Sequence, residues 1–325
     1  MHLLSALFII IVSYNVENLF HPKHDTVAGI EMDDIEWTAD GERHWSYTRY
    51  YRKVENIARV LTNIGEWDGV DIVGLQEVEN ALVVKRLCYT LRRGEYDFVH
   101  YESPDQRGID VALIYKKARV DTLRTRAIRV PLSEETTRDI LYVCASIKAS
   151  GDTIHFFVCH LPSRRGGAAE SEWKRDQAKK VLQAAVDSVF AISPQAKIVV
   201  MGDMNSAPKE DLMGLRNRMM NETFLGGGRS SRKREDAPGT HKYQGHWMCL
   251  DQFYTSAALD SVSDVQVYDA EWIQEPDEKY LGLKPKRTYI GYQYQNGFSD
   301  HLPIVLKITT GTDATSANYD SHSAQ

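Results

Sequence analysis

Apolar residues recur at every third or fourth position in two stretches of the chain, which is the spacing of a helix that covers a sheet with one face. The first stretch lies within residues 54–64 and the second within residues 178–189. A third segment, NALVVKRLCYTLRR from Asn80, is also expected to be helical. The pattern therefore predicts three helices with an apolar side toward the core.

Short apolar runs that are rich in β-branched and aromatic residues predict strands. These runs are FIIIVSY, DIVGL, YDFVHYE, VALIY, ILYVCASIK, TIHFFVC, KIVVM, QFYTS and LPIVLKI. Early in the chain they alternate with the expected helices, whereas strands follow one another between about 97 and 160, where we expect an up-and-down meander from residue 110 onward. This mixture predicts an α/β protein, of the α+β kind, with mixed sheets.

No linker divides the chain, so we expect one domain over residues 1–308, in which residues 1–7 are leader residues or a signal remnant. The last segment, 309–325, has almost no apolar content and is expected to be a disordered tail. The glycine-rich and basic segment GGGRSSRKRED at 226–236 is expected to be a mobile surface loop.

The apolar stretch from Leu3 to Val12 has no Lys or Arg before it and runs directly into VSYNVENLF. A first strand with a short leader is therefore favoured over a signal peptide, which begins with a charged region. The stretch is also too short to span a membrane. A cytoplasmic monomer is the favoured expectation, with export through an atypical signal left open.

The composition is that of a globular protein with a full core, with 42% hydrophobic and 26% charged residues among 325. The net charge is −6, from 39 basic and 45 acidic residues. A protein that grips long nucleic acid without sequence preference usually has a basic surface, so any contact with nucleic acid must be local. The four cysteines match neither a zinc pattern nor a disulfide framework.

The stretch KIVVMGDMNSAP, 197–208, runs an apolar strand into a carboxylate and an amide. Taken alone it is an ordinary turn, but other polar residues also lie at strand boundaries. Those after a predicted strand are Asn15, Glu17, Glu77, His160, Asp203 and Asn205, and those before one are Asp110, Asp251, Asp300 and His301. Because the end of one strand and the start of an antiparallel neighbour meet at one edge, we expect these residues to gather at one end of the sheets.

The expected cluster is rich in oxygen ligands, contains two imidazoles and has no thiolate. Such oxygen ligands favour Mg²⁺ or Mn²⁺ over zinc. Carboxylates beside imidazoles also provide general bases and the groups that orient them. Metal-assisted phosphoester hydrolysis uses all of these groups together.

The motifs SYNVENLF, LQEV, CHLPS, GDMNSAP, LDQF and SDHLP resemble, in order, those of the endonuclease/exonuclease/phosphatase superfamily, over nearly all of residues 10–308. The resemblance implies a four-layer sandwich in which two packed sheets are flanked by helices and the site lies at one end. It implies deoxyribonuclease-like, metal-dependent phosphoesterase activity.

The resemblance also implies a role for each polar residue. Glu77 is the expected principal metal ligand, with Asn15 and Asp300 close by. Asp203 is expected to activate the attacking water, while Asn205 holds water or phosphate. His301 is expected to contact the phosphoryl oxygens, and Asp251 is expected to orient His301. His160 is expected to contact phosphate or the leaving group. Asp110 could orient His160, or it could be a plain strand-entry residue.

The substrate is the least determined property. Arg164 and Arg165 follow His160 in LPSRRGG and could clamp a second phosphate, or they could lie on a solvated turn. Aromatic residues such as Trp45 and Tyr50 could stack on bases or lie in the core. A phosphodiesterase or nuclease is the leading hypothesis. A small-molecule or lipid phosphoesterase, of the sphingomyelinase or inositol-phosphate phosphatase kind, and a catalytically inactive binding module are the alternatives.

Overall fold

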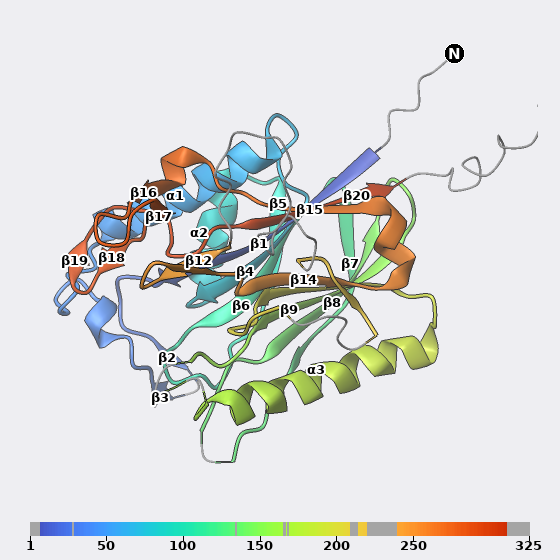
Figure 1. Ribbon diagram of the computed structural model, residues 1–325, viewed down its shortest axis with the longest axis horizontal. Helices are drawn as coiled ribbons and strands as arrows, with labels where there is room; N and C mark the ends of the chain where they lie inside the picture. Colours follow the sequence, from blue (N-terminus) through green and yellow to red (C-terminus); the bar gives the residue numbers. More distant parts are fainter. Residues whose placement is uncertain are drawn as a thin grey trace, which may run out of the picture.

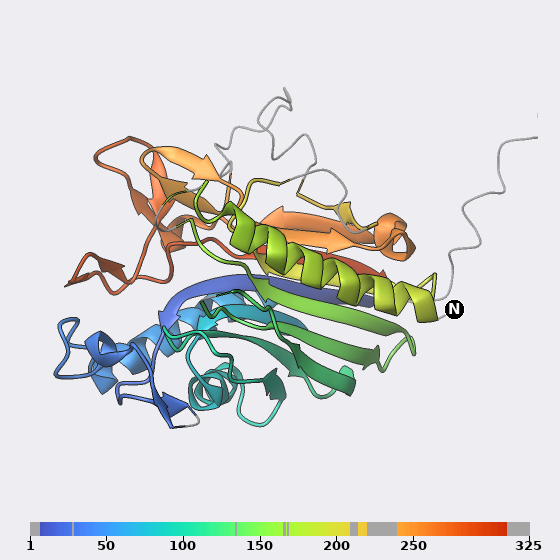
Figure 2. The same cartoon turned by 90° about the horizontal axis from the view of Figure 1, so that it is seen from below.

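Two β-sheets packed face to face form the centre of the molecule (Figures 1 and 2). The computed structural model describes residues 7–27, 29–133, 135–164, 167, 169–208, 214–219 and 239–310. Helices cover the outer faces of both sheets, so the expected four-layer sandwich is confirmed. None of the helices in this described part combines the length and apolar composition that crossing a bilayer requires.

The first sheet has six strands, and its central pair, β1 and β4, is parallel. The other neighbours in this sheet are antiparallel. In spatial order the strands are β15 (Ser263–Val267), β20 (Ile304–Thr310), β1 (Leu7–Leu19), β4 (Ile72–Val78), β6 (Asp110–Lys116) and β5 (Tyr96–His100).

The second sheet also has six strands with one parallel pair, β10 and β9, at its centre. In spatial order the strands are β11 (Arg216–Asn217), β14 (Asp251–Thr255), β10 (Lys197–Asp203), β9 (Thr153–His160), β8 (Ile140–Ile147) and β7 (Val120–Ile128). Each sheet therefore sends the carboxyl ends of two parallel strands to the same end of the sandwich.

Among the described residues, three α-helices form the outer layers. They are α1 (Tyr47–Gly65), α2 (Ala81–Leu91) and α3 (Glu172–Ile192). Helices α1 and α2 pack on the first sheet and α3 packs on the second. Asn80 begins α2, because its side-chain oxygen accepts hydrogen bonds from the N–H groups of Leu82 and Val83 at 2.9 and 3.2 Å.

The remaining elements of the described part of the chain are short. The 3-10 helices are η1 (Ile35–Trp37), η2 (Ala257–Val262) and η3 (Glu271–Ile273). The two-stranded pairs are β2 (Thr26–Val27) with β3 (Ile30–Glu31), β12 (His241–Tyr243) with β13 (His246–Met248), β16 (Gln274–Pro276) with β17 (Leu283–Pro285), and β18 (Tyr289–Ile290) with β19 (Gln293–Tyr294).

The apolar core lies in three layers, one between the sheets and one under the helices of each side. Between the sheets, residues such as Ile11, Val143 and Phe156 are fully buried. Burial of each such side chain contributes about 1.5–3 kcal/mol. The helical stripes read from the sequence form the outer layers, where Ile57 of α1 and Leu182 of α3 are fully buried.

The three helix predictions and the nine predicted strands are confirmed, but the sheet assignment between residues 110 and 160 is wrong. Strand β6 belongs to the first sheet, whereas β7, β8 and β9 belong to the second. Strand β7 was missing from the predicted runs because it lies at a sheet edge and its sequence VDTLRTRAI alternates with exposed charged residues. Strand β15, another missed strand, is also at an edge.

Strand β20 continues to Thr310, two residues into the segment expected to be a disordered tail. The remainder of that segment and the glycine-rich loop at 226–236 lie outside the described residues.

Gly202 is required where β10 delivers its polar residues to the site. Its φ of +140° is rarely adopted by other residues, and a Cβ there would lie 1.9 Å from the carbonyl oxygen of Cys159 on β9. The close approach of the β9 and β10 backbones therefore depends on the absence of a side chain at this position.

Replacement of this glycine tests the close approach. Gly202→Ala adds backbone strain, which costs about 1–3 kcal/mol, and overpacking, which costs about 1–3 kcal/mol more. Gly151→Ala is the matched control, because Gly151 also has a positive φ, +73°, with nothing near the added carbon. Urea unfolding should show the larger loss for Gly202→Ala. Equal losses would mean that strain alone matters and that the strands can separate.

Candidate active site

Polar side chains from both sheets meet at the carboxyl ends of the parallel strands. In the second sheet, Asp203 of β10 is the register partner of His160 on β9 and of Asp251 on β14. In the first sheet, Asn15 pairs with Gln76, one residue before Glu77. The two central strand pairs thus deliver most of the predicted site residues to one place.

Asn15 joins the two sheets. Its Nδ2 donates to Asp203 Oδ2 at 3.2 Å and lies 3.4 Å from Glu77 Oε1. Asn15 and Asp203 are almost completely buried. One amide group therefore holds a carboxylate of each sheet, and the two carboxylates are brought close together.

Glu77 leaves the regular strand geometry at the site. Its φ is +64°, in the left-handed region, and the β4–β6 register shifts between Gln76 and Val78. Its Oε2 accepts a hydrogen bond from the N–H of Asn18 at 2.9 Å. Asn18 has a φ of +55° and Asn205 one of +47°. Such backbone conformations cost free energy and persist where the surrounding structure holds them, typically at functional sites.

His301 and Asp251 form a buried ion pair. The carboxylate of Asp251 accepts a hydrogen bond from His301 Nδ1 at 2.7 Å, which directs Nε2 into the site, 3.9 Å from Asp203 Oδ2. Burial lowers the pKa of His301, but the charges of Asp251, Asp203 and Asp300 outweigh it and raise the pKa well above its ordinary value. His301 is therefore an imidazolium that presents an N–H to the site.

His160 has the opposite character. Burial, together with the charges of Arg138, Arg107 and His301, lowers its pKa well below the ordinary value, so the ring is neutral. Its Nε2 lies 3.7 Å from Asp203 Oδ2 and 3.8 Å from Glu77 Oε1, beyond hydrogen-bond distance. In the described part of the chain its Nδ1 has no hydrogen-bond partner.

Asp203 has a pKa suited to proton transfer. Burial raises its pKa to about 6, against the lowering effect of His301 and of the Asn205 N–H, which donates to Asp203 Oδ1 at 2.8 Å. A base with a pKa near neutrality is effective at accepting a proton from water. The side chain of Asn205 is itself fixed, since its Nδ2 donates to the carbonyl of Leu161 at 3.0 Å.

Asp300 lies between cationic groups. Burial would raise its pKa, but His301, Arg287, His241 and Lys53 lower it to about 2. Arg287 Nη2 donates to Asp300 Oδ2 at 2.6 Å.

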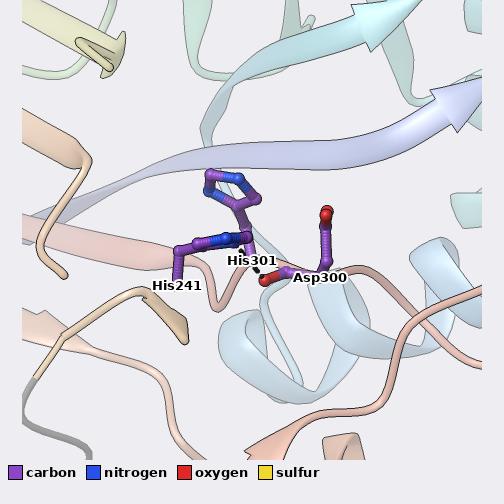
Figure 3. Close-up of side chains that lie close together, drawn as sticks. All are labelled: His241, Asp300 and His301. Atoms are coloured by element: carbon purple, nitrogen blue, oxygen red, sulfur yellow. Dashed lines mark hydrogen bonds between the residues drawn. The ribbon is translucent and has the colours of Figure 1, made fainter. Parts of the chain in front are cut away.

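A third imidazole, His241, lies against His301, with ring centroids 4.6 Å apart (Figure 3). His241 Nδ1 donates to the backbone carbonyl of Asp300 at 3.0 Å, because that oxygen can only accept. Burial lowers the pKa of His241 to about 4. Its Nε2 is therefore unprotonated and carries a lone pair.

A buried network supports Asp300 from behind. Glu17 Oε2 accepts from the N–H of Thr288 at 2.6 Å, and its other oxygen lies 3.5 Å from Arg287 Nε. The fully buried Lys53 Nζ donates to Thr288 Oγ1 and lies 4.0 Å from Glu17. These contacts fix the segment that carries Arg287, and through Arg287 they fix Asp300.

The structure does not pair Asp110 with His160. Asp110 lies at the expected edge, but its Oδ2 is 3.2 Å from His100 Nε2 and its Oδ1 accepts from the N–H of Ser103 at 3.1 Å. The expected orientation of His160 by Asp110 is not observed, because both carboxylate oxygens of Asp110 contact groups of its own sheet side, His100 and Ser103.

The expected arginines are only partly described. Arg164 is exposed, and its Nε donates to the carbonyl of Asn205 at 3.0 Å, which places it on the rim of the site. Arg165 lies outside the described residues.

Sequence reasoning missed three charged or titratable residues of the site, namely His241, Arg287 and Lys53. Glu17, two residues after Asn15 in the motif SYNVENLF, was identified at a strand end but was given no role. Lys53 interrupts the apolar stripe of α1 as a fully buried cation. His241 and Arg287 lie in irregular segments whose position relative to the sheets the sequence does not reveal.

The residues fit a hard divalent cation. Glu77 and Asp203 face each other across the Asn15 amide with no lysine or arginine ion pair to either in the described part of the chain. Carboxylate and amide oxygens are the ligands that Mg²⁺ and Mn²⁺ prefer. His241, Asp300 and His301 also place possible ligand atoms within 4.8 Å of one another (Figure 3), but His301, as an imidazolium, has no lone pair for a metal.

Residues 10–310 match the model of the Endonuclease/Exonuclease/phosphatase family. The chain therefore belongs to this family, and the resemblance carried by its six motifs is confirmed. The family and its fold support a phosphoester hydrolase. No curated protein matches the chain.

Solved structures share the fold. A truncated Caenorhabditis elegans TDP2 has 18% identity and a TM-score of 0.57, over 93% of this chain and 98% of its own. The human Nocturnin catalytic domain has 18% identity and a TM-score of 0.54, over 93% of both chains. A Bacteroides thetaiotaomicron mannosyl-6-phosphatase has 14% identity and a TM-score of 0.53, over 92% of this chain and 98% of its own. At these identities the likeness establishes the fold alone.

The His301–Asp251 ion pair should behave as one unit. Asp251→Asn and His301→Asn should each lower kcat severely, and the double variant should be little worse than the worse single variant. The same cycle on His100 and Asp110, another buried His–Asp contact at 3.2 Å, is the control and should mainly change stability. Additive losses in log kcat for the first pair would contradict the coupling.

Proposed function

We propose that the protein is an Mg²⁺- or Mn²⁺-dependent phosphoester hydrolase. The observation that carries the proposal is the meeting of Glu77 and Asp203 on Asn15, beside the imidazolium of the His301–Asp251 pair. This arrangement combines acidic oxygen ligands, a base of nearly neutral pKa and a fixed cationic donor. Metal-assisted hydrolysis of a phosphoester can use each of these groups.

Glu77, with Asn15 and Asp300 close by, would hold the cation. When bound, such a cation neutralises phosphoryl charge and orients the substrate. The left-handed backbone at Glu77 turns the carboxylate out of the sheet, and the Asn18 N–H fixes one of its oxygens. The ligand is therefore positioned before any cation or substrate binds.

Asp203 is the group that takes the proton from the attacking water. Its Oδ1 is occupied by the Asn205 N–H, so Oδ2 is the oxygen that faces the other site groups. Asn205 holds the turn that follows β10 in place and can itself position water or a phosphate oxygen.

The two predicted imidazoles divide the remaining work. His301 presents Nε2–H, with positive charge, to the phosphoryl oxygens as negative charge builds on them. His160 is neutral, so it can donate one hydrogen bond to phosphate or to the leaving oxygen without adding a charge.

Hydrolysis of a phosphodiester and of a phosphomonoester can both use this centre, because both expose a phosphoryl group to the same donors. The structural relatives include a Danio rerio TDP2 complexed with a single-strand DNA product and a mannosyl-6-phosphatase. A nuclease remains a candidate through Arg164 on the rim. Trp45 and Tyr50 do not favour it, because both are buried in the core.

The metal requirement can be measured as binding and as turnover. EDTA should abolish hydrolysis of a chromogenic phosphodiester or phosphomonoester, and Mg²⁺ or Mn²⁺ should restore it. Glu77→Gln removes a ligand charge and should weaken Mn²⁺ binding in calorimetry by about 10-fold or more. Glu55→Gln, at an exposed position of α1, is the control and should leave Mn²⁺ binding unchanged.

Two results would contradict the metal assignment. Full activity in EDTA would remove the requirement for a cation, and unchanged Mn²⁺ affinity in Glu77→Gln would remove Glu77 from its ligands. Metal binding without turnover of any ester would indicate a catalytically inactive binding module.

Asp203→Asn tests the proposed base. The amide keeps the size of the side chain but cannot take a proton, and loss of a general base costs about 10²–10⁴-fold in rate. We expect the loss in kcat, with KM and the melting temperature little changed. Asp97→Asn, at an exposed position of β5, is the control. A kcat within threefold of the parent would assign the proton transfer to another group.

A further inference from the structure

A cavity of about 770 Å³ opens beside the proposed metal centre. Asn18 and Arg107 form the side that faces the centre, and η1 with the segment after it forms the opposite side. The connection is direct, because Asn18, which lines this cavity, donates its N–H to Glu77 Oε2 at 2.9 Å. The cavity therefore adjoins the carboxylate that is proposed to hold the cation.

Arg107 lies between the cavity and the proposed metal centre. Its Nη2 donates to the side-chain oxygen of Asn18 at 2.9 Å, and in the described part of the chain it forms no ion pair with a carboxylate. The neighbouring Arg138 differs, since it is bound to Asp105 at 2.9 Å. Arg107 also lines a second cavity of about 410 Å³. A half-buried guanidinium without a carboxylate partner keeps donors free for an anion such as phosphate.

The far side of the larger cavity is acidic. The cavity is lined by four carboxylates and only two arginines. The carboxylates are those of Asp33, Glu36, Asp40 and Glu42. Glu36 is neutralised by Arg43 at 3.1 Å, whereas Asp33 and Asp40 are exposed carboxylates with no ion pair among the described residues. A chain of further phosphates leading into this cavity would meet like charge, so the cavity does not suit a polynucleotide.

A cation already lies over two aromatic rings of the cavity. The Arg43 guanidinium lies 4.4 Å from the ring centre of Trp37 and 5.0 Å from that of Tyr292. A quaternary ammonium group, which binds on open aromatic faces, would meet the repulsion of this guanidinium at either ring. The cavity instead offers carboxylate acceptors and guanidinium donors side by side. This combination suits hydroxyl groups, which both donate and accept.

We propose that Arg107 binds a phosphoryl oxygen of the substrate and that the 770 Å³ cavity takes the esterified group, a compact, uncharged group rich in hydroxyls, such as a sugar or polyol. This inference rests on the proposed hydrolase function and names its substrate class. It assigns the phosphate contact to a residue within the motif RGIDVALIY, next to the centre, in addition to Arg164 on the rim.

The first experiment measures binding of inorganic phosphate in the presence of Mg²⁺ by calorimetry, so it needs no turnover. Arg107→Gln should weaken phosphate binding by about 10- to 100-fold, as expected for loss of a charged hydrogen bond, while Arg107→Lys should restore part of the affinity. Arg129→Gln, at an exposed arginine paired with Asp139, is the control. Unchanged phosphate affinity in a folded Arg107→Gln protein would overturn the assignment.

The second experiment measures kcat/KM for glucose 6-phosphate, glycerol 3-phosphate, phosphocholine and a short single-stranded oligonucleotide. The parent should prefer the first two substrates. In the double variant with Asp33→Asn and Asp40→Asn, the ratio of kcat/KM for these two substrates to kcat/KM for the oligonucleotide should fall several-fold. Preference of the parent for the oligonucleotide or for phosphocholine would overturn the substrate class, and so would an unchanged preference in the double variant.

Failure of the proposed function would look different. A parent protein that hydrolyses no ester with either metal, chromogenic esters included, would remove the hydrolase proposal, and the calorimetric result on Arg107 would still report whether the phosphate contact exists. If the parent hydrolyses other esters and Arg107→Gln keeps the phosphate affinity of the parent, only the substrate inference would be wrong.

Discussion

The hydrogen bonds of the Asn15 amide set the conditions for the rest of the site. This single side chain holds Asp203 of one sheet and lies within 3.4 Å of Glu77 of the other. Two carboxylates that contact one amide nitrogen carry like charge and repel each other. One amide does not remove that repulsion. The arrangement is therefore stable only because the two sheets are locked together elsewhere, and it favours any cation that enters.

The two sheets are held together by the apolar core and by a buried polar network. The layer between the sheets is built of fully buried aliphatic and aromatic side chains. Behind the site, Lys53, Glu17 and Thr288 join α1, β1 and the segment before β20. Breaking one partner of such a buried network leaves an uncompensated charge and typically costs about 3–5 kcal/mol. The same network that stabilises the fold therefore limits how far Asp300 can move.

The sequence predicted the elements better than their assembly. Helix periodicity identified all three helices, because one face of each is buried on a sheet. Polar residues at strand ends identified the cluster, because strand ends in mixed sheets gather at shared edges. The pairing of Asp110 could not be obtained this way, since it depends on which sheet each strand joins. His241 and Arg287 lie in irregular segments placed by tertiary contacts alone, and no periodic pattern marks them.

The hydrogen bond from Ser299 Oγ to the carbonyl of Asn15 joins residues 284 positions apart in the sequence. The pairing of β1 with β20 spans a similar separation and brings His301 beside residues of the opposite sheet. Contacts of this range form late, because the entropy of closing so long a loop is lost before the contacts compensate for it. A partly folded chain therefore has no assembled centre, and the recovery of catalytic activity during refolding would report completion of the whole tertiary structure rather than of any one sheet.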